Sequence, residues 1–341
     1  MAGYNVAVVG ATGMVGQTFV QVLLERKFPV KGWKLLASSR SADKKIHIEG
    51  KDYPIEEATP ASFAGVDFAF FSAGADISLQ LAPEAVKKGA VVVDNSSAFR
   101  MEPEVPLVVP EVNPGDAFKH KGIIANPNCS TIQMVVVLQP LHLAAGLKRV
   151  VVATYQSVSG AGREAVEELA AQSLAVLEKK EMKKEYIPYK GASVHHQIAF
   201  NMVPHIDVFV EDDYTKEEMK MINETRKIMG IPDLPITATT VRVPVFNGHS
   251  EAVNVEFKKP LSPGEARELL AKSPGIIVKD DPAEFVYPMP VDTEGKDEVF
   301  VGRIRYDRSV PYGLNLWIVA DNIRKGAATN SIQIAELLIQ G

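Results

Sequence analysis

The chain is very poor in cysteine, because Cys129 is the only one among 341 residues. A single thiol excludes an intrachain disulfide and is typical of a reducing compartment. The N-terminus also lacks the basic stretch and cleavage site of a signal peptide, since an apolar strand begins at Tyr4. We therefore expect a cytoplasmic protein, and the lone thiol raises the question of a chemical role.

Positive charge is not in excess and no apolar run is long. Lys and Arg number 37 against 42 Asp and Glu, a net charge of -5, so we expect no nucleic-acid partner. A membrane span needs about 18–20 apolar residues. Even the stretch 131–147 is interrupted by Gln133, Gln139, Pro140 and His142, so we expect no membrane partner.

Clusters of metal-ligating residues are also missing from the sequence. His195 and His196 are neighbours that would point opposite ways on a strand, and they have no nearby Cys or suitably spaced carboxylate. We predict no metal site.

The length favours two domains. Over the first 130 residues, short runs rich in Val, Ala and Ile alternate with helical patterns at 14–27 and 82–88. Runs that are hydrophobic on both faces indicate a parallel sheet covered on both sides. The sequence therefore predicts an α/β fold whose first domain is a Rossmann-type, doubly wound dinucleotide-binding domain. The predicted strands are 6–9, 33–37, 66–71, 90–94 and 122–125.

The pattern changes after Cys129, where a helix at 130–145 precedes longer β-rich stretches. Few crossovers and long strands predict a mixed or antiparallel sheet in an α+β domain. The C-terminal amphipathic helix is expected to return to the first domain. The predicted domains are 1–128 with 323–341, and 129–322. The charge-dense stretches 178–185 and 211–218 are interpreted as solvated faces or loops. The predicted strands here are 149–157, 238–245, 252–257, 298–306 and 314–319.

A glycine-rich turn directly follows the first strand and opens the first helix. Its glycines, Gly10, Gly13 and Gly16, allow a tight turn and a close backbone approach to a ligand. The helix N-terminus offers unpaired amides to a pyrophosphate. We predict that a dinucleotide binds at Gly10, Thr12, Gly13, Met14, Val15 and Gly16.

The end of the second strand carries hydroxyls and a guanidinium instead of the carboxylate that would bind an NAD ribose. Ser39 and Arg40 suit a 2′-phosphate, because Arg offers planar bidentate donors and a full charge. The sequence therefore predicts NADP as cofactor in preference to NAD.

Cys129 lies in Asn126-Pro127-Asn128-Cys129-Ser130, where a strand passes into a helix. Unpaired amides and the helix dipole at that position favour a thiolate. A thiolate beside a hydride carrier is what acyl-thioester oxidoreduction requires, so we predict that Cys129 is a nucleophile.

Taken together, these motifs resemble the aspartate-semialdehyde dehydrogenase family, in family order and over nearly the whole chain. The segments that carry the resemblance are Gly10 to Gly16, Asn95 to Arg100, Asn126 to Cys129, Gln156 to Gly162, Glu217 with Lys220, Arg242 to Pro244, Gly248 to Ser250, and Asp321 to Ala328.

The resemblance implies reversible conversion of L-4-aspartyl phosphate to L-aspartate 4-semialdehyde with NADP(H) and phosphate, in lysine, threonine and methionine biosynthesis. It places Asn128, Cys129, Gln156 and His249 in the catalytic site. Cys129 would form the acyl-thioester and His249 would be the general acid/base. A histidine of ordinary pKa, about 6.5, can exchange a proton near neutral pH.

The resemblance also implies the ligands of the small-molecule substrate. Arg242 corresponds to the carboxylate clamp, and Arg100 and Lys220 to phosphate-binding positions. Glu217 would meet the substrate ammonium, and it shares a helix face with Lys220 if 215–229 is helical. His249 lies seven residues after Arg242, so a turn at Asn247-Gly248 must bring it back to the same side.

Ser159 and Gly160 would lie near the nicotinamide, with Asn322 near the cofactor, and the family suggests a homodimer formed through the second domain. N-acetyl-glutamyl-phosphate reductase remains an alternative, although Glu217 and Lys220 with the Arg242 to His249 signature favour a free amino acid. A catalytically silent relative would be expected to lack Cys129, Arg242 or His249, and all three are present. A thiol peptidase or acyltransferase would not explain the nucleotide turn.

Overall fold

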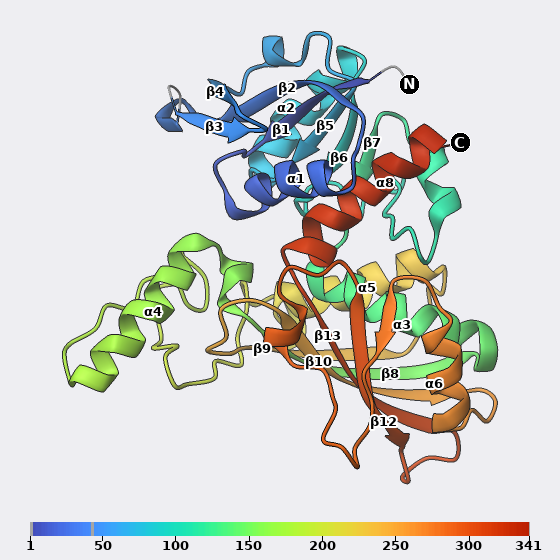
Figure 1. The fold of residues 1–341 in the computed structure, drawn as a ribbon. Helices are drawn as coiled ribbons and strands as arrows, with labels where there is room; N and C mark the ends of the chain where they lie inside the picture. Colours follow the sequence, from blue (N-terminus) through green and yellow to red (C-terminus); the bar gives the residue numbers. More distant parts are fainter. Residues whose placement is uncertain (1–2, 42–43, 341) are drawn as a thin grey trace. The chain divides into compact units, whose positions relative to one another are not determined.

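The computed structural model describes residues 3–41 and 44–340 (Figure 1). Its internal contacts divide the chain into two compact units. The first unit consists of Met1–Asn128 and Ala327–Gly341, and the second of Cys129–Gly326. The outer limits of the predicted first domain, Met1 and Gly341, lie outside the described residues. Residues 323–326 belong to the second unit, where Arg324 bonds Asp297 at 2.8 Å.

The first unit contains a seven-stranded sheet in the order β3-β4-β2-β1-β5-β6-β7. All neighbours are parallel except β3 and β4, which form an antiparallel hairpin. This confirms the predicted doubly wound α/β fold. The strands are β1 (Tyr4–Val9), β2 (Val30–Ala37), β3 (Lys45–Ile48), β4 (Lys51–Glu57), β5 (Phe68–Phe71), β6 (Val91–Asp94) and β7 (Ile123–Ala125).

Both faces of this sheet are buried along its central strands β1, β5 and β6, which explains their two-sided hydrophobicity. Val6, Val8 and Phe70 point to one face, where they join the core formed with helices α1 and α8. Phe71 points to the other face and stacks on Phe63 at a ring-centroid distance of 5.7 Å. The helices of this unit are α1 (Met14–Glu25), α2 (Ala75–Lys87) and α8 (Thr329–Gln340).

Two features of the first unit differ from the prediction. Helix α2 begins at Ala75, not at residue 82, and continues through Pro83. Its real start signals are Gly74, with φ of 90°, and Asp76 in the first turn. The β3–β4 hairpin was not predicted, because its strands carry exposed charged side chains and bury only Ile48 and Ile55.

The second unit contains a six-stranded sheet in the order β11-β12-β13-β10-β8-β9. It is mixed, which agrees with the predicted mixed or antiparallel sheet, but its edge strand at 276–278 was not predicted. Helix α3 packs on this sheet and is apolar around nearly its whole circumference, as a buried helix must be. The strands are β8 (Leu147–Gln156), β9 (Ile236–Arg242), β10 (His249–Phe257), β11 (Ile276–Val278), β12 (Val299–Tyr306) and β13 (Gly313–Ala320). The helices are α3 (Cys129–Ala145), α4 (Arg163–Glu178), α5 (Lys216–Met229), α6 (Pro263–Ala271) and α7 (Pro290–Thr293).

None of the helices in residues 3–41 and 44–340 combines the length and apolar character that crossing a membrane requires. Within the same part of the chain, His, Cys, Asp and Glu side chains form no group of three that could hold a metal ion.

Candidate active site

The glycine-rich turn lies at the carboxyl end of β1, in the first unit. Gly10 N and Ala11 N donate to Leu36 O of β2, at 2.8 and 3.1 Å, which ties the turn to the neighbouring strand. Gly10 has φ of 88°, and a side chain there would clash with Ser72 O. A side chain at Gly16 would clash with Gly10 O. The turn therefore requires glycine for its own packing, and α1 begins directly after it.

Gly13 is the N-cap of α1, and no side chain caps this helix end. Among residues 3–41 and 44–340, a Cβ at Gly13 would meet only Gly10 O, at 3.3 Å. The turn thus leaves space beside a helix N-terminus, which is the geometry that accepts a pyrophosphate. The residues present fit a dinucleotide cofactor.

Ser39 and Arg40 lie in a short 3-10 helix that directly follows β2. Both side chains are exposed. Because the Gly10 turn is bonded to the last residues of β2, this exposed guanidinium and the turn belong to the same end of the sheet. That is the end at which open α/β sheets bind ligands.

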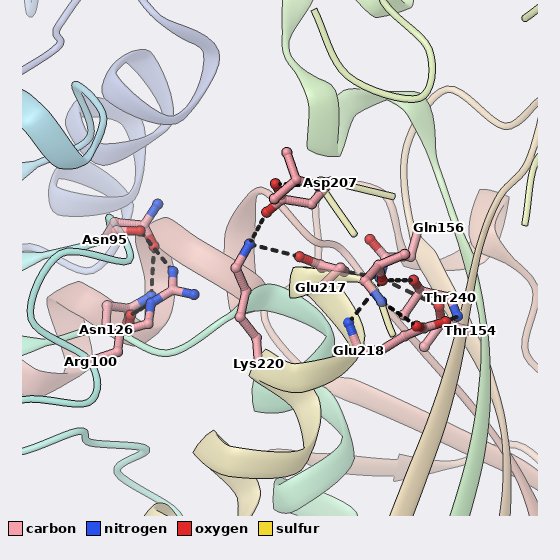
Figure 2. Close-up of polar contacts among 12 residues, drawn as sticks. Asn95, Arg100, Asn126, Thr154, Gln156, Asp207, Glu217, Glu218, Lys220 and Thr240 are labelled. Carbon is pink, nitrogen blue, oxygen red and sulfur yellow. Dashed lines mark hydrogen bonds and ion pairs between the residues drawn. The ribbon is translucent and has the colours of Figure 1, made fainter. Parts of the chain in front are cut away.

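Arg100, also in the first unit, is buried in the loop region that follows β6. Its Nε donates to Asn126 O at 3.0 Å and its Nη2 to Asn95 O at 2.9 Å (Figure 2). Asp94 anchors the loop by accepting from the hydroxyls of Ser78 and Ser96, each at 2.7 Å. Burial raises the pKa of Asp94, and these hydrogen bonds oppose the rise.

Four strand ends of the second unit meet at one edge of its sheet. Gln156 ends β8 and pairs with Arg242, which ends the parallel strand β9. His249 begins β10, which runs antiparallel to β8 on the other side. His249 pairs with Ala320 at the end of β13, and Asn322 follows two residues later. The topology therefore collects residues that are far apart in sequence.

His249 is fully buried, and its orientation is fixed by Ser157. Its Nδ1 accepts from the Ser157 backbone N–H at 3.1 Å, and Ser157 Oγ lies 3.0 Å from the same atom. A backbone N–H can only donate, so the proton of the neutral ring is on Nε2. Nε2 is buried and has no hydrogen-bond partner among the residues that the structure describes. His249 therefore presents an unused donor.

The pKa of His249 is lowered to about 3, chiefly by burial and then by the positive charge of Arg242, against the opposing charge of Glu217. This pKa is far below the ordinary histidine value of about 6.5, and proton exchange by His249 during turnover stays a prediction. The ring is neutral at pH 7, because the low-dielectric surroundings and a neighbouring cation disfavour the imidazolium.

Arg242 is buried beside His249. Its Nη1 donates to Ser157 O at 2.7 Å, and its buried Nε has no hydrogen-bond partner in residues 3–41 and 44–340. Burial lowers the pKa of Arg242, and the negative charges of Glu217 and of a Cys129 thiolate oppose this fall. Cys129, the first residue of α3, is therefore near enough for its charge to act on the guanidinium.

Gly160 leaves room over these two side chains. A Cβ there would lie 3.0 Å from Arg242 Nη1 and 3.2 Å from His249 Nε2. The predicted turn at Asn247-Gly248 does return His249 to the side of Arg242, and Gly248 has φ of 86°. Three hydrogen bonds hold this turn in place. Ser159 Oγ donates to Asn247 Oδ1, and Gly248 N donates to Asn322 Oδ1. Asn322 Nδ2 in turn donates to Ser159 Oγ.

Gln156, Glu217 and Lys220 form a continuous polar chain (Figure 2). Gln156 Nε2 donates to Glu217 Oε1 at 3.2 Å, and Lys220 Nζ donates to Glu217 Oε2 at 3.0 Å. The predicted helix and shared face are confirmed. Lys220 Nζ also donates to Asp207 Oδ2 at 2.8 Å. Asp207 was not among the residues predicted from the sequence. The lysine thus lies between two carboxylates.

The start of α5 is fixed by a capping box. Thr215 accepts from Glu218 N at 3.3 Å, and Glu218 accepts from Thr215 N at 2.8 Å. Glu218 also accepts from Thr240 N of β9 at 3.0 Å, which ties the helix to the sheet. The interpretation of 211–218 as a solvated stretch is therefore wrong at its end, because Glu217 and Glu218 are buried.

The structure brings the predicted residues of the second unit together. In the second unit, Gln156, Ser159, Gly160, Glu217, Lys220, Arg242, His249 and Asn322 are linked by the contacts above, with Cys129 at the start of α3. In the first unit, Arg100 and Asn128 are both buried. Ser157, which contacts both His249 and Arg242, was not among the predicted site residues, although it lies between Gln156 and Ser159.

Comparison with known proteins agrees with this geometry. Residues 5–120 match the family "Semialdehyde dehydrogenase, NAD binding domain", and residues 138–325 match "Semialdehyde dehydrogenase, dimerisation domain". The aspartate-semialdehyde dehydrogenase of Aquifex aeolicus is 59% identical over 99% of this chain and 98% of its own length. The chain belongs to the aspartate-semialdehyde dehydrogenase family.

Solved structures of aspartate-semialdehyde dehydrogenases have the same fold. That of aspartate semialdehyde dehydrogenase II from Vibrio cholerae, complexed with ASA, has a TM-score of 0.95 and 46% identity, and the match covers 100% of this chain and 99% of that one. The Candida albicans enzyme with NADP has a TM-score of 0.75 and 27% identity, with 99% of each chain covered.

Proposed function

We propose that the chain catalyses the reversible reductive dephosphorylation of L-4-aspartyl phosphate to L-aspartate 4-semialdehyde, in the biosynthesis of lysine, threonine and methionine. One observation carries the proposal. Two buried donors without partners in the described chain, Arg242 Nε and His249 Nε2, belong to side chains that flank Gly160, near Cys129. Buried donors are normally hydrogen-bonded, so these two donors are suited to a ligand that carries oxygen acceptors.

The proposed chemistry begins with attack of the Cys129 thiolate on the acyl phosphate carbonyl carbon. The carbon–oxygen bond to phosphate breaks, and an acyl-thioester remains on Cys129. Bound NADPH would supply the hydride for reduction of this thioester. The Nε2–H of His249 then donates to the oxyanion of the thiohemiacetal, and breakage of the carbon–sulfur bond returns the thiolate and releases the aldehyde. A neutral His249 suits this role as hydrogen-bond donor.

Substrate recognition is assigned to the charged groups around the donor pair. Arg242 binds the α-carboxylate, for which its planar fork is suited, and Glu217 binds the ammonium group. Gln156 orients the substrate and is itself held by Glu217. Asn128 lies next to Cys129 in the chain and completes the proposed catalytic set. Arg100 and Lys220 supply positive charge for the phosphate.

NADP is the proposed cofactor. The Gly10 to Gly16 turn would hold the pyrophosphate, Ser39 and Arg40 the 2′-phosphate, and Ser159, Gly160 and Asn322 the nicotinamide end. Support comes from the exposed Arg40 guanidinium and from the Candida albicans relative, whose structure was solved with NADP. The dimerisation-domain match supports a homodimer formed through the second unit.

The test is phosphate-dependent reduction of NADP by aspartate semialdehyde, with NAD and with N-acetyl-glutamate semialdehyde in parallel. We expect turnover with the free amino acid, and turnover with the N-acetyl compound alone would contradict the proposal. Cys129→Ser should abolish turnover while NADP binding survives, because a hydroxyl is a far weaker nucleophile than a thiolate. Turnover of Cys129→Ser within a few-fold of wild type would remove the thioester from the mechanism.

A further inference from the structure

Directly beyond His249, a second ionisable side chain is buried without any role in the proposed chemistry. Glu251 is fully buried and lies two residues after His249 on β10, so the two side chains share a face of the sheet. Its neighbours in register are Thr154 on β8 and Ile318 on β13, and neither carries a charge. In the described chain, neither carboxyl oxygen has a hydrogen-bond partner.

Gln133 is the polar residue that faces Glu251 from helix α3. Burial raises the pKa of Glu251 well above its ordinary value, and only the Gln133 side chain opposes the rise. Gln133 Nε2 donates to the backbone carbonyl of His249 at 3.3 Å, and Gln133 Oε1 is buried without a partner among the described residues. Among the described residues, this place therefore holds three buried acceptor oxygens that receive no hydrogen bond.

A proton on Glu251 would supply a donor for these oxygens. Buried polar atoms are almost always paired, and a buried carboxylate without a cation is costly. A neutral carboxyl has an O–H that can donate, and Gln133 Oε1 is the acceptor beside it. The result is a continuous chain from Glu251 through the Gln133 amide to the His249 carbonyl.

Gln133 also connects this chain to the proposed nucleophile. Cys129 and Gln133 are four residues apart in α3, so they lie one turn apart on the same helix face. The Gln133 amide thus joins the helix that carries Cys129 to the strand that carries His249.

We propose that Glu251 and Gln133 are positioning residues, in which a protonated Glu251 carboxyl fixes the Gln133 amide and this amide sets His249 relative to Cys129. The proposal rests on the proposed function, because it assumes that Cys129 and His249 act on one substrate. It explains why a carboxyl is buried where the reaction needs no charge.

The first experiment reads the protonation of Glu251 without using activity. Infrared spectra of the full chain at neutral pH should contain the C=O band of a protonated carboxylic acid, which Glu251→Gln should remove. Glu256→Gln is the matched control on the same strand, because Glu256 is paired with Lys148 and should leave the band unchanged. A wild-type spectrum without that band would overturn the proposal.

The second experiment tests positioning. Glu251→Gln keeps a donor toward Gln133, so kcat should stay within about two-fold of wild type. Glu251→Leu and Gln133→Met should each lower kcat on the order of 10- to 100-fold with little change in KM, since small misplacements of reacting groups have effects of that size. Gln139→Met, on the same helix, is the control.

A double-mutant cycle separates positioning from a merely structural role. Gln133→Met should cost little further kcat in a His249→Gln background, because the residue it positions is already gone. An equal loss in both backgrounds would overturn the proposal. Failure of the proposed function is distinguishable, since it would appear as unchanged turnover in Cys129→Ser, whatever the infrared spectrum and the cycle give.

Discussion

Acidification should destabilise the folded chain through His249 in particular. In the unfolded chain this histidine has a pKa of about 6.5, whereas burial and Arg242 lower its folded pKa to about 3. Between these values the unfolded chain binds a proton that the folded chain excludes. Above about pH 6.5 the ring is neutral in both states, so His249 does not lower the free energy of unfolding. As the pH falls from about 6.5 toward 3, protonation of the unfolded chain progressively lowers that free energy.

The size of the effect follows from the same two values. Each pH unit between them is worth about 1.4 kcal/mol, so going from pH 7.5 to pH 5 should remove about 2 kcal/mol of stability. Solvent does not screen this charge effect, because His249 is fully buried. His249→Gln keeps a polar side chain of similar reach but cannot be protonated in this range, so it should lack this part of the pH dependence.

The assay is urea unfolding at one fixed protein concentration, at pH 7.5 and pH 5. Wild type should lose about 2 kcal/mol more than His249→Gln between the two pH values. His196→Gln, which removes an exposed imidazole, is the control for loss of a histidine as such. If wild type and His249→Gln lost equal stability, His249 would not be the buried neutral ring described here, and its role as a neutral Nε2–H donor would have no basis.

Two further predictions concern ligand binding. Arg40→Ala should weaken NADP much more than NAD, because only NADP has the 2′-phosphate, and equal weakening in titrations of both would place the guanidinium elsewhere. Asp207→Asn should lower the KM for phosphate several-fold in the oxidative direction, because it removes one of the two carboxylates that hold Lys220. Asp207 has φ of 69°, which Asn tolerates, and Asp212→Asn on the exposed loop is the control. An unchanged or higher KM would mean that Asp207 does not compete with phosphate.

Local patterns predicted the parts of the fold that depend on neighbours in sequence. The glycine turn after β1 and the shared face of Glu217 and Lys220 follow from spacings of three residues. The return of His249 follows from a glycine turn. The start of α2 was missed because Pro83 obscures a helix that tolerates it, and the partner of Lys220 was missed because Asp207 comes from a separate loop.

The properties of the site that decide its chemistry come from sheet topology, which no local pattern contains. β8 lies between β9, parallel to it, and β10, antiparallel to it, so the end of β8, the end of β9 and the start of β10 fall at one edge. This order places Arg242 beside His249, lowers the pKa of that histidine and leaves Ser157 to fix both. The strand order buries His249 beside Arg242, and this burial and charge keep its imidazole a neutral donor.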